Sequence, residues 1–271
     1  MTATCRLLGL VCLAACGPPA ADETAQLSLV EELEIGQVGI EYFAHAAFRI
    51  RSPGGRQVLI DPYADRVWLG YDFPDSVDAD AILITHPHYD HDAGDRMGRP
   101  FPWGPETPVF RDPGTYSVGD ITIHGVRGKH ADPYGKEFGQ INTLFVLEVA
   151  GLRIAHLGDN GPLTETNIRE LGRVDILMMP ADAQYHILSA ADTESNLAAL
   201  KPRVLIPMHY QLPDLEASPD DPSDLGPIGP WLEGRSNVQR LDSHIKVFSK
   251  AALPQKDIIV VFRHSPKVIK P

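Results

Sequence analysis

A ten-residue stretch from Thr85 to Gly94, with the sequence THPHYDHDAG, constrains this chain more than any other feature. It follows an apolar run, Ala81 to Ile84, and a short run of this kind predicts a buried strand. Side chains on a loop just beyond such a strand are held at the edge of a rigid sheet. The stretch contains four side chains of the types that bind divalent metals, namely His86, His88, Asp90 and His91. Their spacing lets the first pair reach one metal and the second pair another. A polar surface loop that happens to be rich in histidine is the alternative, but it leaves three further candidate ligands downstream unexplained.

Composition limits the classes of protein to which the chain can belong. Its 271 residues suffice for one large domain or two small ones, and its apolar and charged fractions, 43% and 22%, are those of an ordinary globular protein. The formal net charge is −12, whereas a nucleic-acid-binding surface needs clustered Lys and Arg. We therefore expect no nucleic-acid partner and interpret the excess of acid as a solvated surface that favours solubility.

The first sixteen residues have the pattern of an export signal. Arg6 precedes an apolar segment, Leu7 to Ala15, that is too short to span a bilayer as a helix. The segment runs into Leu-Ala-Ala-Cys, which resembles the lipobox of bacterial lipoproteins and marks Cys16 as the lipidated residue. We predict a signal peptide over residues 1–15, a tether over 16–36, and lipid anchoring to a bacterial membrane on its periplasmic or cell-surface side. An ordinary signal peptide that is cut elsewhere is the alternative.

The cysteines agree with this interpretation. All three of them, Cys5, Cys12 and Cys16, lie in the leader. No disulfide and no cysteine nucleophile are therefore expected in the folded domain, which has to depend on its core and its metal.

The remaining chain, residues 37–271, is predicted to form one domain. Apolar runs bounded by turn residues predict strands over 38–43, 46–51, 57–60, 81–85, 121–126, 141–149, 152–157, 175–179, 204–207, 245–248 and 258–262. Helical patterns at 164–171 and 192–200 begin at Thr164 and at Asp192 or Thr193, which are capping residues. The passage 98–114, rich in Pro, Gly and aromatic residues, is predicted to be a long loop near the mouth of the site. The order of these segments predicts an α/β protein with two mixed sheets packed together and helices outside.

The sequence from His86 to His91, His-Pro-His-Tyr-Asp-His, resembles the HxHxDH motif of the metallo-β-lactamase superfamily. Further signature positions recur downstream and upstream in family order: Asp61 in Leu-Ile-Asp-Pro, His130 in Gly-Lys-His, Asp159 in Leu-Gly-Asp-Asn and His209 in Pro-Met-His-Tyr. The resemblance extends from about Val38 to the C-terminus and implies the αββα sandwich of hydrolytic enzymes. Phe-Ala-His-Ala at 43–46 and Pro-Met-His-Tyr at 207–210 look most similar to the branch that contains ascorbate-6-phosphate lactonase.

The resemblance implies two divalent metal ions, either zinc or, as alternatives, manganese or iron. The ligands would divide into two sets and a bridge: His86, His88 and His130 for one ion, Asp90, His91 and His209 for the other, and Asp159 between them. Two ions so placed would hold and deprotonate a shared water. Asp61 would orient a histidine ligand from behind, because ligating imidazoles usually donate their second N–H to a carboxylate or carbonyl.

Three more residues are candidates for contacts with the substrate. His45 lies between two predicted strands, where it would contact substrate or donate a proton. A packing role for His45 is the alternative. The predicted catalytic set is Asp90, Asp61 and His45. His186, on a loop after a strand, and Tyr210, a possible hydrogen-bond donor to an oxyanion, are predicted to bind substrate.

Two functions follow as hypotheses. The first is a hydrolase in which a hydroxide bridging two metals cleaves an ester, lactone or phosphodiester bond of a small molecule. A phospholipid is one such substrate, given the aromatic loop near a membrane tether. The second is a lipoprotein on the same fold that binds metal or a ligand without catalysis. Asp159 in place of cysteine argues against a β-lactamase with a cysteine ligand. His88 stands where oxygen-reducing diiron relatives carry Glu, which argues against chemistry with O₂.

Overall fold

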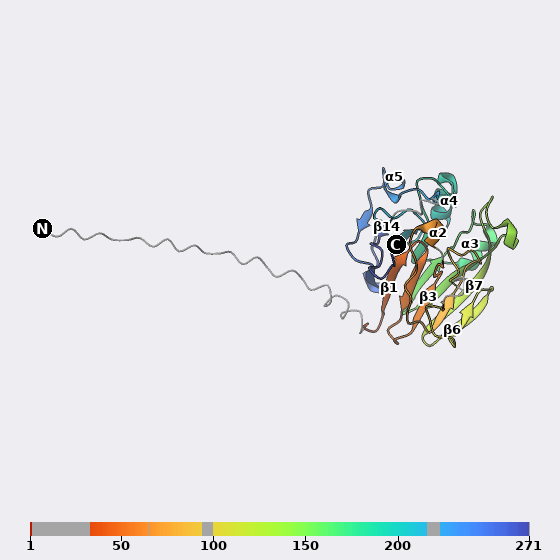
Figure 1. Ribbon diagram of the computed structural model, residues 1–271, viewed down its shortest axis with the longest axis horizontal. Coiled ribbons are helices and arrows are strands. Elements are labelled where there is room, and N and C mark those ends of the chain that lie inside the picture. The colour runs from red at the N-terminus through yellow and green to blue at the C-terminus, as the bar shows by residue number, and fades with distance from the viewer. Residues whose placement is uncertain (2–32, 65, 94–99, 216–222, 271) are drawn as a thin grey trace. The chain divides into compact units, whose positions relative to one another are not determined.

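The computed structural model describes residue 1 and residues 33–64, 66–93, 100–215 and 223–270. The predicted signal peptide, Cys16 and most of the predicted tether lie outside the described residues and stay predictions. Within the described residues the strands form two mixed sheets, as the sequence predicted (Figure 1). Among the same residues, no helix has the length and apolar character that crossing a membrane requires.

The first sheet has the strand order β13-β1-β2-β3-β4-β5. Its strands are β1 (Gln37–Ala44), β2 (Ala47–Arg51), β3 (Gln57–Ile60), β4 (Ala81–Leu83), β5 (Val109–Phe110) and β13 (Ile245–Ser249). Strand β13 and strands β1 to β3 pair antiparallel, whereas β4 joins β3 and β5 joins β4 in parallel. Strands β1, β3 and β4 are buried on nearly every residue, which explains why their sequences are apolar runs rather than alternating patterns.

The second sheet has the order β12-β14-β11-β10-β9-β8-β7-β6. Its strands are β6 (Gly114–Val118), β7 (Ile121–Lys129), β8 (Ile141–Val149), β9 (Leu152–His156), β10 (Ile176–Pro180), β11 (Val204–Met208), β12 (Val238–Arg240) and β14 (Ile258–Val261). Strands β6 to β9 form an antiparallel meander, and β9, β10, β11, β14 and β12 run parallel.

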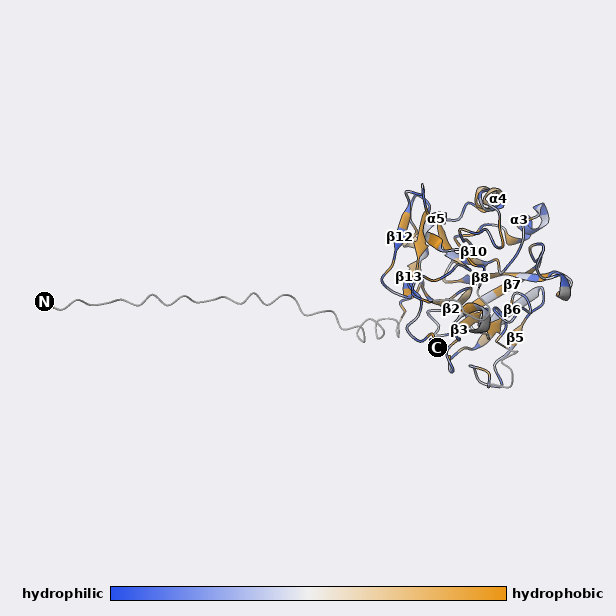
Figure 2. Ribbon diagram, turned by 45° about the horizontal axis from the view of Figure 1, so that its top comes forward, coloured by the Kyte–Doolittle hydropathy of each residue, from blue (hydrophilic) through white to orange (hydrophobic). Residues whose placement is uncertain are grey.

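The helices connect strands and lie outside the sheets (Figure 1). They are α2 (Arg66–Leu69), α3 (Glu165–Leu171), α4 (Ala190–Leu200) and α5 (Ile228–Trp231), with 3₁₀ turns η1 (Lys136–Phe138) and η2 (Lys250–Ala252). Helices α3 and α4 are the crossovers from β9 to β10 and from β10 to β11, as parallel strands require. Apolar residues concentrate on the strands and hydrophilic ones on the outer loops (Figure 2).

Several expectations hold at the level of single residues, and others do not. Thr164 caps α3, as predicted, and the structure adds a capping box with Asn167. The cap of α4 was predicted wrongly, because the helix begins two residues earlier and its cap is Ser189, whose hydroxyl accepts from the N–H of Asp192. Strands β5, β6 and β12 were not predicted, since they are short and their residues are mostly exposed.

The loop predicted near the mouth of the site is divided: residues 101–107 lie elsewhere, whereas Arg111 pairs with Asp92, next to the candidate ligand His91, at 2.9 Å. Phe101 and Trp103 stack with ring centroids 5.5 Å apart and line a hollow together with Gln57 and Asp80, at the start of β3 and β4. The candidate ligands follow the opposite ends of these strands. The aromatic rings of this loop therefore give no support for a phospholipid substrate.

The two sheets are tied together below the candidate site. His156 at the end of β9 accepts a hydrogen bond from the N–H of Gly158 through Nδ1, which places its own proton on Nε2. That proton is donated to the carbonyl oxygen of Ala46 in the first sheet, at 2.9 Å. The backbone N–H of His209 in the second sheet likewise donates to the carbonyl of His45, at 3.0 Å. These bonds fix one sheet edge against the other where the candidate ligands gather.

Strand direction explains why the candidate ligands meet. Strands β1, β3 and β4 of the first sheet run in one direction, as do β7, β9 and β11 of the second. The candidate residues follow the carboxyl ends of these six strands. Three of them adopt left-handed backbone conformations, with φ of +54° at His45, +46° at Asp61 and +58° at His209. Such values are uncommon for residues other than glycine and concentrate at functional sites.

Candidate metal centre

Two groups of metal-binding side chains meet at this edge. One group contains His86, His88, His130 and Asp159, and the other contains His45, Asp90, His91 and His209. Within each group, one donor atom per residue lies within 4.8 Å of the others, and every member is buried except the half-buried His88. The structure thus brings together all seven residues predicted as metal ligands and adds His45 to them.

Asp61 fixes the orientation of two imidazoles. Its fully buried carboxylate accepts hydrogen bonds from Nδ1 of His91 at 2.8 Å and from the backbone N–H and hydroxyl of Thr85 at 2.8 and 2.7 Å. Because the Thr85 hydroxyl donates its hydrogen bond to Asp61, the Thr85 oxygen can only accept from Nδ1 of His86, which lies 3.0 Å away. Both imidazoles therefore carry their proton on Nδ1 and present the Nε2 lone pair to the site.

The Nε2 atoms provide the test of whether a metal fits. Nδ1 of His130 donates to the carbonyl of Ala131 at 3.0 Å, so its Nε2 is also a bare lone pair. The Nε2 atoms of His86, His91 and His130 are all buried and have no hydrogen-bond partner. A buried polar atom without a partner costs free energy, and a cation between these atoms would remove that cost. Imidazole nitrogen and carboxylate oxygen form the donor set that Zn²⁺ and similar ions take.

Asp159 lies between the two groups. Its Oδ2 is 3.7 Å from Nε2 of His86 and 3.6 Å from Nε2 of His130, in the first group. The same carboxylate is 3.1 Å from Nε2 of His209 and 3.3 Å from Nε2 of His91, in the second. One carboxylate thus faces imidazoles of both groups, as a bridging ligand would.

Gly158 and Asn142 set the position of Asp159. Gly158 has φ of +52°, and a Cβ there would lie 2.5 Å from both Thr85 Oγ1 and Asn142 Oδ1. Asn142 donates from Nδ2 to the carbonyl of Leu157 and accepts from the N–H of Asp159, at 2.9 and 3.2 Å. Glycine is therefore required for the chain to pass this close to Thr85, and the buried Asn142 holds the turn in place.

The charges of the site favour a cation. Burial raises the pKa of the Asp159 carboxyl, but the imidazoles of His209 and His91 lower it more, so that it lies well below its usual value. Burial lowers the pKa of His209, whereas the carboxylate of Asp159 raises it more, to about 9. Burial and the neighbouring His91 hold the pKa of His86 well below its usual value, so this imidazole is a neutral ligand. A divalent ion would replace the proton that the Asp159 carboxylate holds on His209.

The structure corrects the expectation that His45 contacts substrate or donates a proton. Its side chain is fully buried behind the site, where Nε2 lies 3.1 Å from Oδ2 of Asp90 and the ring lies 4.1 Å from that of His209. Burial and the neighbouring His209 lower the pKa of His45 to about 3, so the ring stays neutral at physiological pH. The sequence could not show this, because His45 lies just beyond β1 in a left-handed conformation, where strand alternation no longer predicts side-chain direction.

A cavity of about 530 Å³ opens onto the ligands. Its walls include the candidate ligands His88, Asp90, His130 and Asp159. The other walls come from α2 and from four loops, with the side chains Trp68, Tyr89, Pro133, Tyr134, His186, Ile187 and Asp224. The prediction placed His186 at the substrate, and the structure places it in this wall, with Nδ1 3.1 Å from Oδ2 of Asp224.

The structure does not bring Tyr210 to the cavity. Its side chain is 2% exposed, is absent from the described lining, and packs in the core beside Tyr42. Burial raises the pKa of Tyr210 to about 12. The expectation that it donates to an oxyanion is therefore wrong in this geometry, since the chain leaves His209 in a left-handed turn and directs the next side chain inward.

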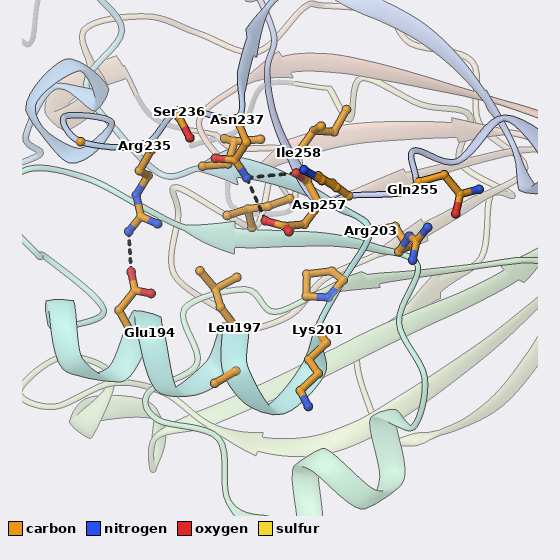
Figure 3. A pocket seen from close by; sticks show the side chains of 16 residues that line it. Glu194, Leu197, Lys201, Arg203, Arg235, Ser236, Asn237, Gln255, Asp257 and Ile258 are labelled. Carbon is orange, nitrogen blue, oxygen red and sulfur yellow. Dashed lines mark hydrogen bonds and ion pairs between the residues drawn. The ribbon is translucent and has the colours of Figure 1, made fainter.

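A larger hollow of about 950 Å³ lies beside α4 (Figure 3). Two pairs of its charged and polar side chains interact with each other: Arg235 with Glu194 at 2.6 Å, and Asn237 with Asp257 at 2.8 Å. Neither of the two groups of metal-binding side chains found among the described residues lies in it. Size alone therefore does not identify the site, and the chemistry assigns it to the smaller cavity.

Several residues of the site were missed by sequence reasoning. Thr85 and Asn142 position ligands, and Trp68, Tyr134 and Asp224 form cavity walls. Thr85 could have been noticed, because it opens the ligand-rich stretch. Asn142 lies at the start of the predicted strand 141–149, where its type alone did not indicate a role. Trp68, Tyr134 and Asp224 come from short or irregular segments, where no periodic pattern shows which way a side chain points.

Replacing Thr85 with valine should weaken metal binding by about 10- to 100-fold, which is the effect of removing a group that orients a metal ligand. Valine keeps the shape of threonine but loses the hydroxyl that joins Asp61 to His86. The measurement is competition for Zn²⁺ against a chromogenic chelator.

Thr193→Val is the matched control. Thr193 is 1% exposed and its hydroxyl has no hydrogen-bond partner, so its loss should leave the Zn²⁺ affinity unchanged. Equal affinities in the two variants would show that the Thr85 hydroxyl does not orient a ligand.

Comparison with known proteins agrees with this geometry. A family model described as a beta-lactamase superfamily domain matches residues 39–209. A UPF0173 metal-dependent hydrolase of Archaeoglobus fulgidus is 30% identical over 205 residues, which cover 67% of this chain and 87% of that protein. Another, from Myxococcus xanthus, is 28% identical over 235 residues, covering 76% of this chain and 83% of that protein.

A solved structure shows the same fold. It comes from Thermotoga maritima and was described as a candidate Zn-dependent hydrolase of the metallo-β-lactamase superfamily. Its sequence is 26% identical and its TM-score is 0.62, and the match covers 84% of this chain and all of that chain. The fold and the donor set define a metal-dependent hydrolase of the metallo-β-lactamase superfamily. Within that superfamily, the chain belongs to the UPF0173 metal-dependent hydrolase family.

Proposed function

We propose that this protein hydrolyses an ester, lactone or phosphodiester bond of a small molecule with the help of two divalent metal ions. One observation carries the proposal: three buried Nε2 lone pairs, on His86, His91 and His130, lack partners and face the carboxylates of Asp90 and Asp159. Membership in a family of metal-dependent hydrolases supports the same conclusion.

The two groups of donors would hold one ion each. His86, His88 and His130 would bind the first, and Asp90, His91 and His209 the second, with Asp159 between them. When bound, two such ions supply a hydroxide at neutral pH and positive charge where an oxyanion develops. Zinc fits a set of imidazole and carboxylate donors, and manganese and iron are the alternatives.

The remaining residues of the chain would position these groups and the substrate. Asp61 and Thr85 set the proton positions on His91 and His86, and His45 holds the Asp90 carboxylate from behind. The cavity would bind the substrate beside the ligands, with His186 and Tyr134 in its wall. Asp61 and His45 are thus positioning residues, since neither contacts the cavity.

The test is reconstitution of the protein after chelation. With added Zn²⁺ we expect two metal ions per chain by elemental analysis. We also expect metal-dependent hydrolysis within a panel of a 4-nitrophenyl ester, a γ-lactone and bis(4-nitrophenyl) phosphate. One ion per chain would contradict the binuclear centre. Two ions with no turnover of any of the three compounds would favour the alternative of a metal-binding lipoprotein without catalysis.

A further inference from the structure

Aromatic rings form the wall of the cavity that leads to the ligands. The Tyr134 and His186 rings lie 4.5 Å apart at 21°, and the His186 and His209 rings lie 5.5 Å apart at 20°. The three rings thus form a nearly parallel column from the rim to a candidate ligand. Trp68 lies beside it, with its ring 5.7 Å from that of His186, and Tyr89 is 42% exposed at the rim. This surface suits a flat or apolar group.

The charged groups of the wall are acidic. Besides the candidate ligands Asp90 and Asp159, the described lining contains Asp224 and no Lys or Arg. The Asp224 carboxylate is held at the rim by His186, at 3.1 Å, and by the hydroxyl of Tyr134, which donates to it at 3.3 Å.

The two lysines that flank this part of the chain lie outside the described lining of the cavity and near an acidic side chain. Lys129 precedes His130, and Lys136 begins the turn that carries Phe138 beside His88. Both ammonium groups pair with Asp132, at 3.8 and 3.9 Å. An anionic substrate would therefore be repelled by the Asp224 carboxylate at the rim, and the described wall has no Lys or Arg to bind its negative charge.

We propose that the cavity takes an uncharged carboxylic ester or lactone whose apolar or aromatic group packs on Tyr134 and Trp68, and that Asp224 selects against anionic substrates, phosphodiesters included. This inference rests on the proposed function and narrows its substrate class. A volume of about 530 Å³ lies within the range of sites for small molecules. In the reaction, the hydroxide oxygen joins the acyl carbon and the acyl C–O bond breaks. The hydroxide's own proton passes to the leaving alkoxide, so the products are an alcohol and a carboxylate, joined in one molecule when the substrate is a lactone. The one proton released overall is the one that water loses to become hydroxide.

The test uses two esters of equal size on the zinc-loaded protein. They are 4-nitrophenyl 4-methylpentanoate and mono(4-nitrophenyl) succinate, in which a carboxylate replaces the isopropyl group. We expect kcat/KM, corrected for the spontaneous rates, to be at least about tenfold higher for the neutral ester, a difference of about 1.4 kcal/mol. Asp224→Asn should reduce this ratio to within about threefold of one. The ratio is insensitive to a uniform loss of activity.

Asp78→Asn is the matched control. Asp78 is exposed near the start of β4, at the opposite end of the strand from the ligands, so its charge should leave the ratio unchanged. A wild-type ratio at or below one, or bis(4-nitrophenyl) phosphate as the best substrate, overturns the inference while metal-dependent hydrolysis stands. A ratio that Asp224→Asn does not change overturns the role of Asp224. No turnover of either ester, of bis(4-nitrophenyl) phosphate or of the γ-lactone by protein with two bound ions overturns the proposed function and the inference together.

Discussion

Replacing Asp159 with alanine should remove most of the bound metal and lower turnover by at least about a thousandfold. The carboxylate faces imidazoles of both ligand groups within 3.1 to 3.7 Å, so its loss affects both ions. The ions would stabilise transition-state charge by several kcal/mol, and each 1.36 kcal/mol is a factor of ten in rate. Elemental analysis and kcat/KM on the best substrate of the panel check the two effects.

Asp78→Ala is the comparison for this variant. It removes an exposed carboxylate at the far end of the first sheet and should keep both the metal content and the rate. Thermal unfolding with and without chelator adds a third measurement, because ions that bind only the folded state raise Tm in the wild type and should not do so in Asp159→Ala. An Asp159→Ala protein with two ions and the wild-type rate would refute the assignment of the site.

Replacing Gly158 with alanine should destabilise the protein and weaken metal binding together. The left-handed backbone at φ of +52° costs an L-residue about 1–2 kcal/mol. The added methyl group would also lie 2.5 Å from Thr85 Oγ1 and Asn142 Oδ1, and forcing such contacts apart costs about 1–3 kcal/mol more. Because Thr85 orients His86, and Asn142 holds the N–H of Asp159, relief of the clash displaces ligands. Denaturant unfolding and Zn²⁺ affinity measure the two losses.

Gly151→Ala separates the clash from the backbone cost. Gly151 has φ of +76° in the hairpin between β8 and β9, and a Cβ there would meet nothing within 4 Å. This variant should lose only the backbone part, with unchanged Zn²⁺ affinity. If both variants lose the same free energy of unfolding, the close approach at Gly158 is not what requires glycine.

The candidate ligand set was predictable because residue type and spacing identify its members in the sequence. His86, His88, Asp90 and His91 occupy one loop after one strand, and their chemistry follows from that segment alone. The resemblance to a known superfamily then supplied His130, Asp159 and His209 from separate strands. The two mixed sheets were predictable for a similar reason, since buried strands are apolar runs whatever their partners.

The fine positions were not predictable from the sequence. His45 and Tyr210 were assigned to the substrate, yet one lies behind Asp90 and the other in the core, because each lies in or follows a left-handed residue at the end of a strand. Trp68, Tyr134 and Asp224 come from short or irregular segments far apart in the sequence and share one cavity.

Residue types and their spacing therefore determined the chemistry of this protein, namely a centre of imidazole and carboxylate donors at the edge of a sheet. The tertiary structure alone decided which side chains back the ligands and which form the wall that meets a substrate. The physical reason is that a periodic pattern fixes side-chain direction only within a regular strand or helix. At a turn, the direction is set by hydrogen bonds between the two sheets, such as those from His156 to Ala46 and from His209 to His45.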